Sequence, residues 1–279
     1  MDTLTIVLML CAAALHASWH GIVKSSGDQL TVLTGMSLIA ALLAACGLPF
    51  VATPPAALWP VLLVSTVLHS GYRFALAQAY RHGDLGQAYP LARGLVPIFA
   101  LGIGVALLGD TLSNGQRGGV VIVSAAVCWL ATEAIRSVQG RLLLAAAVAG
   151  LTVAGYSALD AYGVRHSESW MSYTVWLIVL DSGSFVVLMC FVKGARLWRE
   201  LSEARVRTTV SGILGVGSFA VLLWALGRGP VGVVAALRES SVLFAVLIGV
   251  VFYHERFALH RLAAAALIGF GIALISVAR

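Results

Sequence analysis

Two arginines stand inside long apolar runs, where a charged side chain needs a partner or a function. Arg93 and Arg238 each lie about eight residues into an expected membrane helix, a depth of about 12 Å at 1.5 Å per residue. Half of the hydrocarbon layer measures about 15 Å. Guanidinium groups bind carboxylate or phosphate oxygens in a bidentate manner. The two arginines therefore predict a clamp for an anionic group near the midplane. The alternative is an internal ion pair, for example Arg238 with Asp160 or Asp181.

Five further ionisable residues in apolar runs are candidates for carrying a proton. They are Glu239, Asp160, Asp181, His16 and His20. Burial favours the neutral form of a carboxyl group, which suits proton transfer near neutral pH. The alternative role of Glu239 and Asp160 is to neutralise the arginines.

His16 and His20 share one helix face at i, i+4 spacing. The sequence offers no third ligand beside them, so it predicts neither a metal site nor a cofactor. Arg73 lies deep in its run with His69 one turn before it, and it is expected to pair with Asp160 or Asp181. Aromatic side chains in membrane helices are often packing or interface residues. Those that are candidates for contact with a substrate are Trp19, Tyr72, Tyr89 and Tyr156.

The composition shows that a membrane must surround these residues. Of 279 residues, 60% are apolar and 11% are charged, and the mean hydropathy is +0.95. A soluble domain has about 45–50% apolar and about 25% charged residues, so a soluble enzyme is excluded. The long continuous runs also argue against a β-barrel, whose strands alternate. The net charge of +6 is assigned to loops that face anionic lipid, and no nucleic-acid partner is expected.

The apolar runs predict an all-α integral membrane protein with ten transmembrane helices. Each run approaches the length of about 20 residues that crosses the hydrocarbon core. The expected spans are 4–24, 30–50, 57–79, 85–109, 116–135, 141–164, 170–192, 207–227, 230–252 and 260–278.

The second half of the chain repeats the first. Residues 91–113 fall on residues 236–258 after a shift of 145 positions, which aligns Arg93 with Arg238 and Asp110 with Glu255. The shift predicts two five-helix domains, 1–136 and 141–279. Because five is odd, the second domain enters the membrane from the opposite side. Inverted repeats of this kind recur in secondary transporters, where they open a central site to alternate sides.

The sequence resembles the EamA-type transporters of the drug/metabolite transporter superfamily. The resemblance is carried by HASWHGIVK at 16–24, by AYRHGDLGQAYPLARGLVP at 79–97, and by the acid-ended helices at Asp110 and Glu255. It implies ten helices in two five-helix repeats. It also implies transport of amino acids, other metabolites, nucleotide-sugar-like compounds or toxic organic molecules. The chain has no G-x-x-x-x-G-K-[ST] motif for ATP.

Together these features predict a non-enzymatic secondary transporter, proton-coupled or facilitative, in the cell inner membrane. Its expected partners are the lipid bilayer and a small organic metabolite that bears a carboxylate or another anion, or is zwitterionic. The chain is expected to work as a monomer or a homodimer. The alternatives are an exporter of lipophilic cations and, from other classes, a non-transporting assembly subunit or a membrane-embedded enzyme.

The basic residues also predict an orientation. Eleven Lys and Arg residues lie near the loops that follow odd-numbered spans, against four near the other loops and the C-terminus. Cytoplasmic loops carry the excess of Lys and Arg. Both chain ends are therefore expected in the periplasm, whereas the family resemblance implies both in the cytoplasm.

Overall fold

Helices make up the molecule. The computed structural model describes residues 2–82, 93–137, 140–253 and 259–278, and within these ranges it contains no strand. The α-helices are α1 (Thr3–Lys24), α2 (Gln29–Gly47), α3 (Trp59–His82), α5 (Val96–Leu107), α6 (Asn114–Ser137), α7 (Gly140–His166), α8 (Trp170–Lys193), α9 (Arg196–Glu203), α10 (Arg205–Leu226), α11 (Val231–Arg238), α12 (Ser241–Tyr253) and α13 (Leu259–Val277). Two 3-10 turns, Leu48–Phe50 and Ala56–Leu58, lie between α2 and α3.

The helices are long and apolar enough for a multi-pass membrane protein. Among the described residues, five segments meet the length and hydropathy of a membrane span: Thr3–Lys24, Gln29–Phe50, Leu144–His166, Trp170–Lys193 and Arg205–Leu226. Val96–Leu107 and Leu262–Val277 are shorter apolar helices. The described residues are thus all-helical and hold five candidate membrane spans, while the count of ten spans stays a prediction.

Short polar side chains set several helix starts. Asp2, Asp28 and Ser169 each accept a hydrogen bond from a backbone N–H in the first turn of α1, α2 and α8. These bonds satisfy donors that have no partner within the helix. Gly194 ends α8 with a φ of 58°, a left-handed conformation that a side chain would disfavour.

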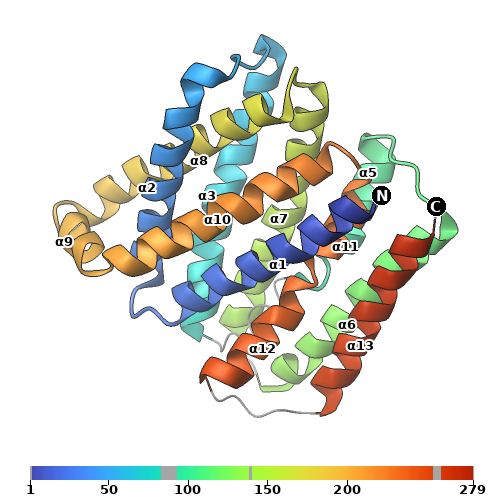
Figure 1. The fold of residues 1–279 in the computed structure, drawn as a ribbon. Coiled ribbons are helices and arrows are strands. Elements are labelled where there is room, and N and C mark those ends of the chain that lie inside the picture. The colour runs from blue at the N-terminus through green and yellow to red at the C-terminus, as the bar shows by residue number, and fades with distance from the viewer. Residues whose placement is uncertain (1, 83–92, 138–139, 254–258, 279) are drawn as a thin grey trace.

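The packing of the helices follows a regular scheme (Figure 1). Helix α3 packs along α7, and α1 packs along α10. Helix α2 packs along α8, and α6 pairs with α13 at the edge of the bundle. The α6–α13 approach is close, because a Cβ added at Gly119 would lie 2.7 Å from the carbonyl oxygen of Gly271. Small residues of this kind let membrane helices touch through their backbones.

The expected span 230–252 is broken in the middle. Helix α11 ends at Arg238 and α12 begins at Ser241, so Glu239 and Ser240 form a turn between them. The hydroxyl of Ser240 donates to the carbonyl of Leu237 at 2.7 Å, a local bond that competes with the helical pattern. A matching interruption follows Arg93, because α5 begins only at Val96. The starts of α5 and α12 lie 145 residues apart, the shift that relates the two halves of the sequence.

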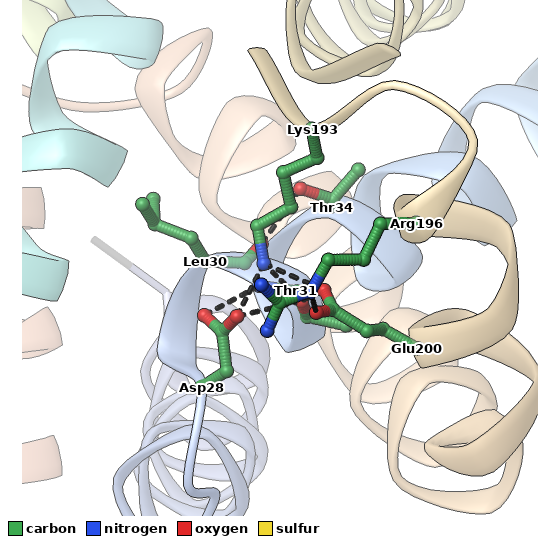
Figure 2. A network of polar contacts seen from close by, with 7 residues as sticks. All are labelled: Asp28, Leu30, Thr31, Thr34, Lys193, Arg196 and Glu200. Carbon is green, nitrogen blue, oxygen red and sulfur yellow. Dashed lines mark hydrogen bonds and ion pairs between the residues drawn. The ribbon is translucent and has the colours of Figure 1, made fainter.

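A polar network ties the start of α2 to α8 and α9 (Figure 2). The ammonium of Lys193 forms an ion pair with Asp28, and donates to Thr31 Oγ1 at 2.5 Å and to Glu200 Oε2 at 2.8 Å. Arg196 donates to the same carboxylate at 2.5 Å. The hydrogen bond from Lys193 is the main reason that the pKa of Glu200 falls to about 2, and bonds from Thr31 and Arg196 add to it.

A second cluster joins other helix ends. The Nη1 of Arg165 donates to Asp110 Oδ1 at 2.7 Å, and its remaining nitrogens donate to the carbonyls of Leu226 and Gly229. The other oxygen of Asp110 accepts from the backbone N–H of Val231, at 2.7 Å. Asp110 therefore holds the α10–α11 connection against the end of α7.

Candidate functional site

A cavity of about 90 Å³ lies between the middle turns of the long helices. Helices α1, α2, α3, α7, α8, α10 and α11 all contribute to its wall. The polar and charged side chains that line it are His16, Ser37, His69, Arg73, Asp181, Ser182, Ser218 and Arg238, and the aromatic ones are Trp19, Tyr72, Tyr156 and Phe219. A concave space with apolar walls and a few convergent polar groups is the usual form of a small-molecule site.

Arg238 reaches the cavity from the break between α11 and α12. The residue is 9% exposed, and in the described part of the chain no carboxylate lies within ion-pair distance of it. Its Nη1 has no hydrogen-bond partner among the described residues. Its Nη2 lies 3.4 Å from His16 Nδ1, at the limit of a hydrogen bond. Arg238 therefore brings a buried positive charge to the cavity without a described counter-charge.

The second arginine of the wall is neutralised. Arg73 donates through both terminal nitrogens to the two oxygens of Asp181, at 2.6 and 2.5 Å. Its guanidinium also lies 4.9 Å from the centre of the Phe185 ring. The expected pairing of Arg73 with an acid across the bundle is thus confirmed, and Asp181 is the partner. This bidentate pair links α3 to α8 beside the cavity.

Arg93 and Glu239 form an ion pair outside the cavity. The Nη2 of Arg93 lies 2.7 Å from Glu239 Oε1, and its Nε lies 3.2 Å from Oε2. Both residues are buried, at 1% and 0% exposure. Arg93 and Arg238 do meet at the wall of a much smaller pocket, of about 10 Å³. The sequence pair therefore converges, but only Arg238 lines the larger cavity.

Asp160 does not line the cavity itself but contacts His69, which does. It accepts hydrogen bonds from Ser65 at 2.5 Å and from Tyr173 at 3.2 Å, and its Oδ2 lies 3.1 Å from His69 Nε2. The ring of His69 lines the cavity and stacks on Tyr156, with 3.8 Å between the ring centres. Asp160 thus positions His69, and it contacts no described arginine.

The histidine pair of α1 lies beside Arg238. His16 faces the cavity, and its Nε2 lies 3.1 Å from His20 Nε2. Trp19 stacks on His20 and donates its indole N–H to His16 Nδ1 at 3.1 Å. Among the described residues, no three His, Cys, Asp or Glu side chains gather in a way that could hold a metal ion.

The structure sorts the predicted residues into three groups. Trp19, Tyr72, Tyr156, His16, Asp181 and Arg238 line the cavity. Arg93, Glu239, Asp160 and His20 lie behind its wall. Tyr89 lies outside the described residues.

Several lining residues were not predicted as site residues: Met36, Ser37, His69, Arg73, Ser182 and Phe219. Their spacing is the feature of the sequence that could have identified them. They lie three or four residues from other lining residues on the same helix face, as positions 33, 36, 37 and 40 do on α2.

Comparison with known proteins agrees with this architecture. Residues 140–277 match the sequence model of the EamA-like transporter family. The second half of the chain thus matches the EamA-like transporter family. No curated protein matches this EamA-like chain significantly. One solved structure, titled only as the crystal structure of a protein, aligns with a TM-score of 0.71 at 17% identity, over 99% of this chain and 98% of that one. At that identity the likeness concerns the fold alone. Family members are membrane transporters, so a bilayer and a small-molecule substrate are implied.

Proposed function

We propose that this chain is a secondary transporter whose halves, 1–136 and 141–279, are inverted repeats around the central cavity. The packing scheme supports the repeat. Exchanging the halves turns the α3–α7 pair into the α1–α10 pair and leaves α2–α8 and α6–α13 as they are. The two helix interruptions obey the same shift of 145 residues. Broken helices at corresponding positions of two halves are typical of transporter substrate sites.

The substrate class follows from Arg238. Arg73 and Asp181 form an ion pair, whereas Arg238 lines the cavity with no described carboxylate within ion-pair distance. A carboxylate would supply both the counter-charge and the acceptors for a bidentate interaction. We therefore propose a small carboxylate-bearing solute. The missing counter-charge of Arg238 is the single observation that carries this proposal.

Binding of four probes with one carbon skeleton tests the substrate class. L-Lactate is anionic, L-alanine zwitterionic, L-lactamide neutral and L-alaninamide cationic. We expect L-lactate to raise the thermal stability of the purified protein and to bind most tightly, with L-alanine next. Lactamide and alaninamide are expected to have no effect. In Arg238→Gln the effect of lactate is lost, whereas it persists in the matched control Arg228→Gln, an exposed arginine that stacks on Trp224.

Other outcomes would favour the alternatives. Tight binding of alaninamide and not of lactate would identify a cation exporter, with Asp181 and the aromatic wall as its site. Exchange across liposome membranes separates a transporter from an assembly subunit or an embedded enzyme. Absence of lactate exchange by the reconstituted wild type, together with absence of binding, would overturn the proposed function.

A further inference from the structure

His69 and Asp160 form a buried pair at the wall of the cavity. His69 lies on α3 and lines the cavity, and its Nε2 lies 3.1 Å from Oδ2 of Asp160 on α7. The hydroxyls of Ser65 and Tyr173 both donate to Oδ1 of the same carboxylate. The side chains of His69 and Asp160 are 8% and 1% exposed. An imidazole and a carboxylate that share a hydrogen bond can together hold either one proton or two.

The contacts of this pair indicate which ring nitrogen takes up the second proton. Because Oδ1 of Asp160 accepts from two hydroxyls, Oδ2 is the oxygen that accepts the N–H of His69. The hydrogen of the neutral imidazole then sits on Nε2, since the bond of one ring nitrogen sets the tautomer. In the described part of the chain, Nδ1 of His69 has no hydrogen-bond partner. Its lone pair is therefore available to a proton from the cavity.

His16, the histidine of α1 that faces the cavity, has both ring nitrogens engaged. Its Nδ1 accepts the indole N–H of Trp19 at 3.1 Å, and its Nε2 lies 3.1 Å from Nε2 of His20. Each imidazole nitrogen offers either one lone pair or one hydrogen. His16 would have to break an existing bond to bind a proton, whereas His69 would not.

The charged neighbours of His69 are largely balanced by ion pairs. Arg73 lies one turn further along α3, and both oxygens of Asp181 on α8 hold its guanidinium. Behind the wall, Arg93 pairs with Glu239. The titratable groups that other elements bring to the same side of the cavity are Tyr156 from α7, Tyr173 from α8, His16 from α1 and Arg238 from α11, while α2 and α10 bring Ser37, Ser218 and Phe219, which do not titrate.

We infer that the His69–Asp160 pair is the proton-binding site that couples substrate transport to a proton gradient, an inference that rests on the proposed function. With one proton the pair carries a negative charge, which balances Arg238 across the cavity without touching it. A substrate carboxylate at Arg238 brings a second negative charge. A proton from the cavity then adds to the lone pair of His69 Nδ1. The product is an imidazolium bound to the Asp160 carboxylate, and no other bond forms or breaks.

Charge balance explains why the substrate and the proton move together. In the empty cavity the charges of Arg238 and of the His69–Asp160 pair sum to zero, and they do so again when a carboxylate and a proton are both bound. The carboxylate alone would leave a net negative charge, and the proton alone a net positive one. A net charge inside the membrane is costly. The empty and the doubly loaded forms are therefore favoured for crossing. The proton enters and leaves through the cavity with the substrate, so it needs no separate path.

Proton uptake on lactate binding tests the inference. The purified protein is titrated with L-lactate by calorimetry in two buffers of different ionisation enthalpy, at several values between about pH 6 and about pH 9. Lactate stays ionised over this range, so the difference between the buffers reports protons taken up by the protein. We expect the wild type to take up as much as about one proton for each lactate. Where uptake is complete, the Kd should rise about tenfold for each pH unit.

Asp160→Asn changes the charge of the pair and keeps its shape. The amide oxygen can still accept from Ser65 and Tyr173, while the amide nitrogen donates to Nε2 of His69 and moves the ring hydrogen to Nδ1. The pair is then neutral without a proton from the cavity. We expect this variant to bind lactate without proton uptake, with a Kd that does not change with pH. Uptake of lactate driven by a pH gradient should fall to the level of protein-free liposomes.

The matched control is His166→Gln, which replaces an exposed histidine at the end of α7 that stacks on Tyr162. We expect it to keep the proton uptake and the gradient-driven transport of the wild type. His69→Gln should lose both, because Asp160 alone does not line the cavity, and it replaces Asp160→Asn if that variant does not fold.

Two results would overturn the inference and leave the transporter intact. One is lactate binding by the wild type without proton uptake at any pH in the range. The other is proton uptake that persists in Asp160→Asn or His69→Gln, which would place the proton on another group. A wild type that neither binds nor exchanges lactate would instead overturn the proposed function, and the proton site with it.

Discussion

Replacement of Glu239 by glutamine separates a structural role of Arg93 from a role in the substrate clamp. The substitution keeps the shape of the side chain and removes the carboxylate that lies 2.7 Å from the guanidinium of Arg93. Arginine does not lose its proton in proteins, so the variant leaves a positive charge buried at 1% exposure. Breaking a buried pair in this way costs about 3–5 kcal/mol. We expect the free energy of unfolding of Glu239→Gln to fall by that amount.

Replacement of the partner, Arg93, is expected to lower the free energy of unfolding by less. In Arg93→Gln the carboxyl group of Glu239 can take up a proton and become neutral, which arginine cannot match. The loss is then that of buried hydrogen bonds, about 1–3 kcal/mol. The double variant Arg93→Gln/Glu239→Gln carries no unpaired charge and should be more stable than Glu239→Gln alone. The two single effects therefore do not add, as is usual for residues in direct contact.

The measurement is equilibrium unfolding in mixed detergent micelles, followed by tryptophan fluorescence. Arg228→Gln serves as the control, because this exposed arginine pairs with no described acid and should change stability by less than about 0.5 kcal/mol. If Glu239→Gln matches the wild type in stability and Arg93→Gln abolishes lactate binding, the ion-pair interpretation is refuted. Arg93 would then belong to the substrate clamp that the sequence predicts.

Three further predictions concern packing, pH and orientation. Gly163→Ala should lower stability by about 1–3 kcal/mol, because its Cβ would lie 2.0 Å from the ring of Tyr173, whereas Gly102→Ala, with no atom within 4 Å, should be neutral or slightly stabilising. Since the pKa of Glu200 is lowered from 4.5 to about 2, its ion pairs stabilise the protein above pH 4.5, and unfolding curves should show this contribution fading as the pH falls towards 2. A Glu200→Gln variant should then be less stable than the wild type at pH 7, and the two stabilities should become equal as the pH falls towards 2. In a background without the native cysteines, Ser202→Cys should resist an impermeant maleimide in intact cells and Ser167→Cys should react, while the opposite pattern would put both chain ends in the cytoplasm.

The sequence by itself determined the class of the protein and the location of its charges. A chain that is 60% apolar must put its helices in a membrane, because only there do so many apolar side chains leave water. The shift of 145 residues found in the sequence also relates the interruptions after Arg93 and Arg238, although the sequence led us to expect continuous spans there. The acidic residues that could neutralise the arginines were all identifiable, because an ionisable residue in an apolar run is conspicuous.

Only the tertiary structure decided which charges meet. The sequence left Arg73 free to pair with Asp160 or Asp181, and Arg238 with the same two acids. In the folded chain Arg73 pairs with Asp181, and Arg93 pairs with Glu239. Arg238 lines the cavity without a described acidic partner. An ion pair forms between atoms within about 4 Å, and the partners here stand 108 and 146 residues apart. Their distance depends on how helices pack and rotate against each other, which no local pattern specifies.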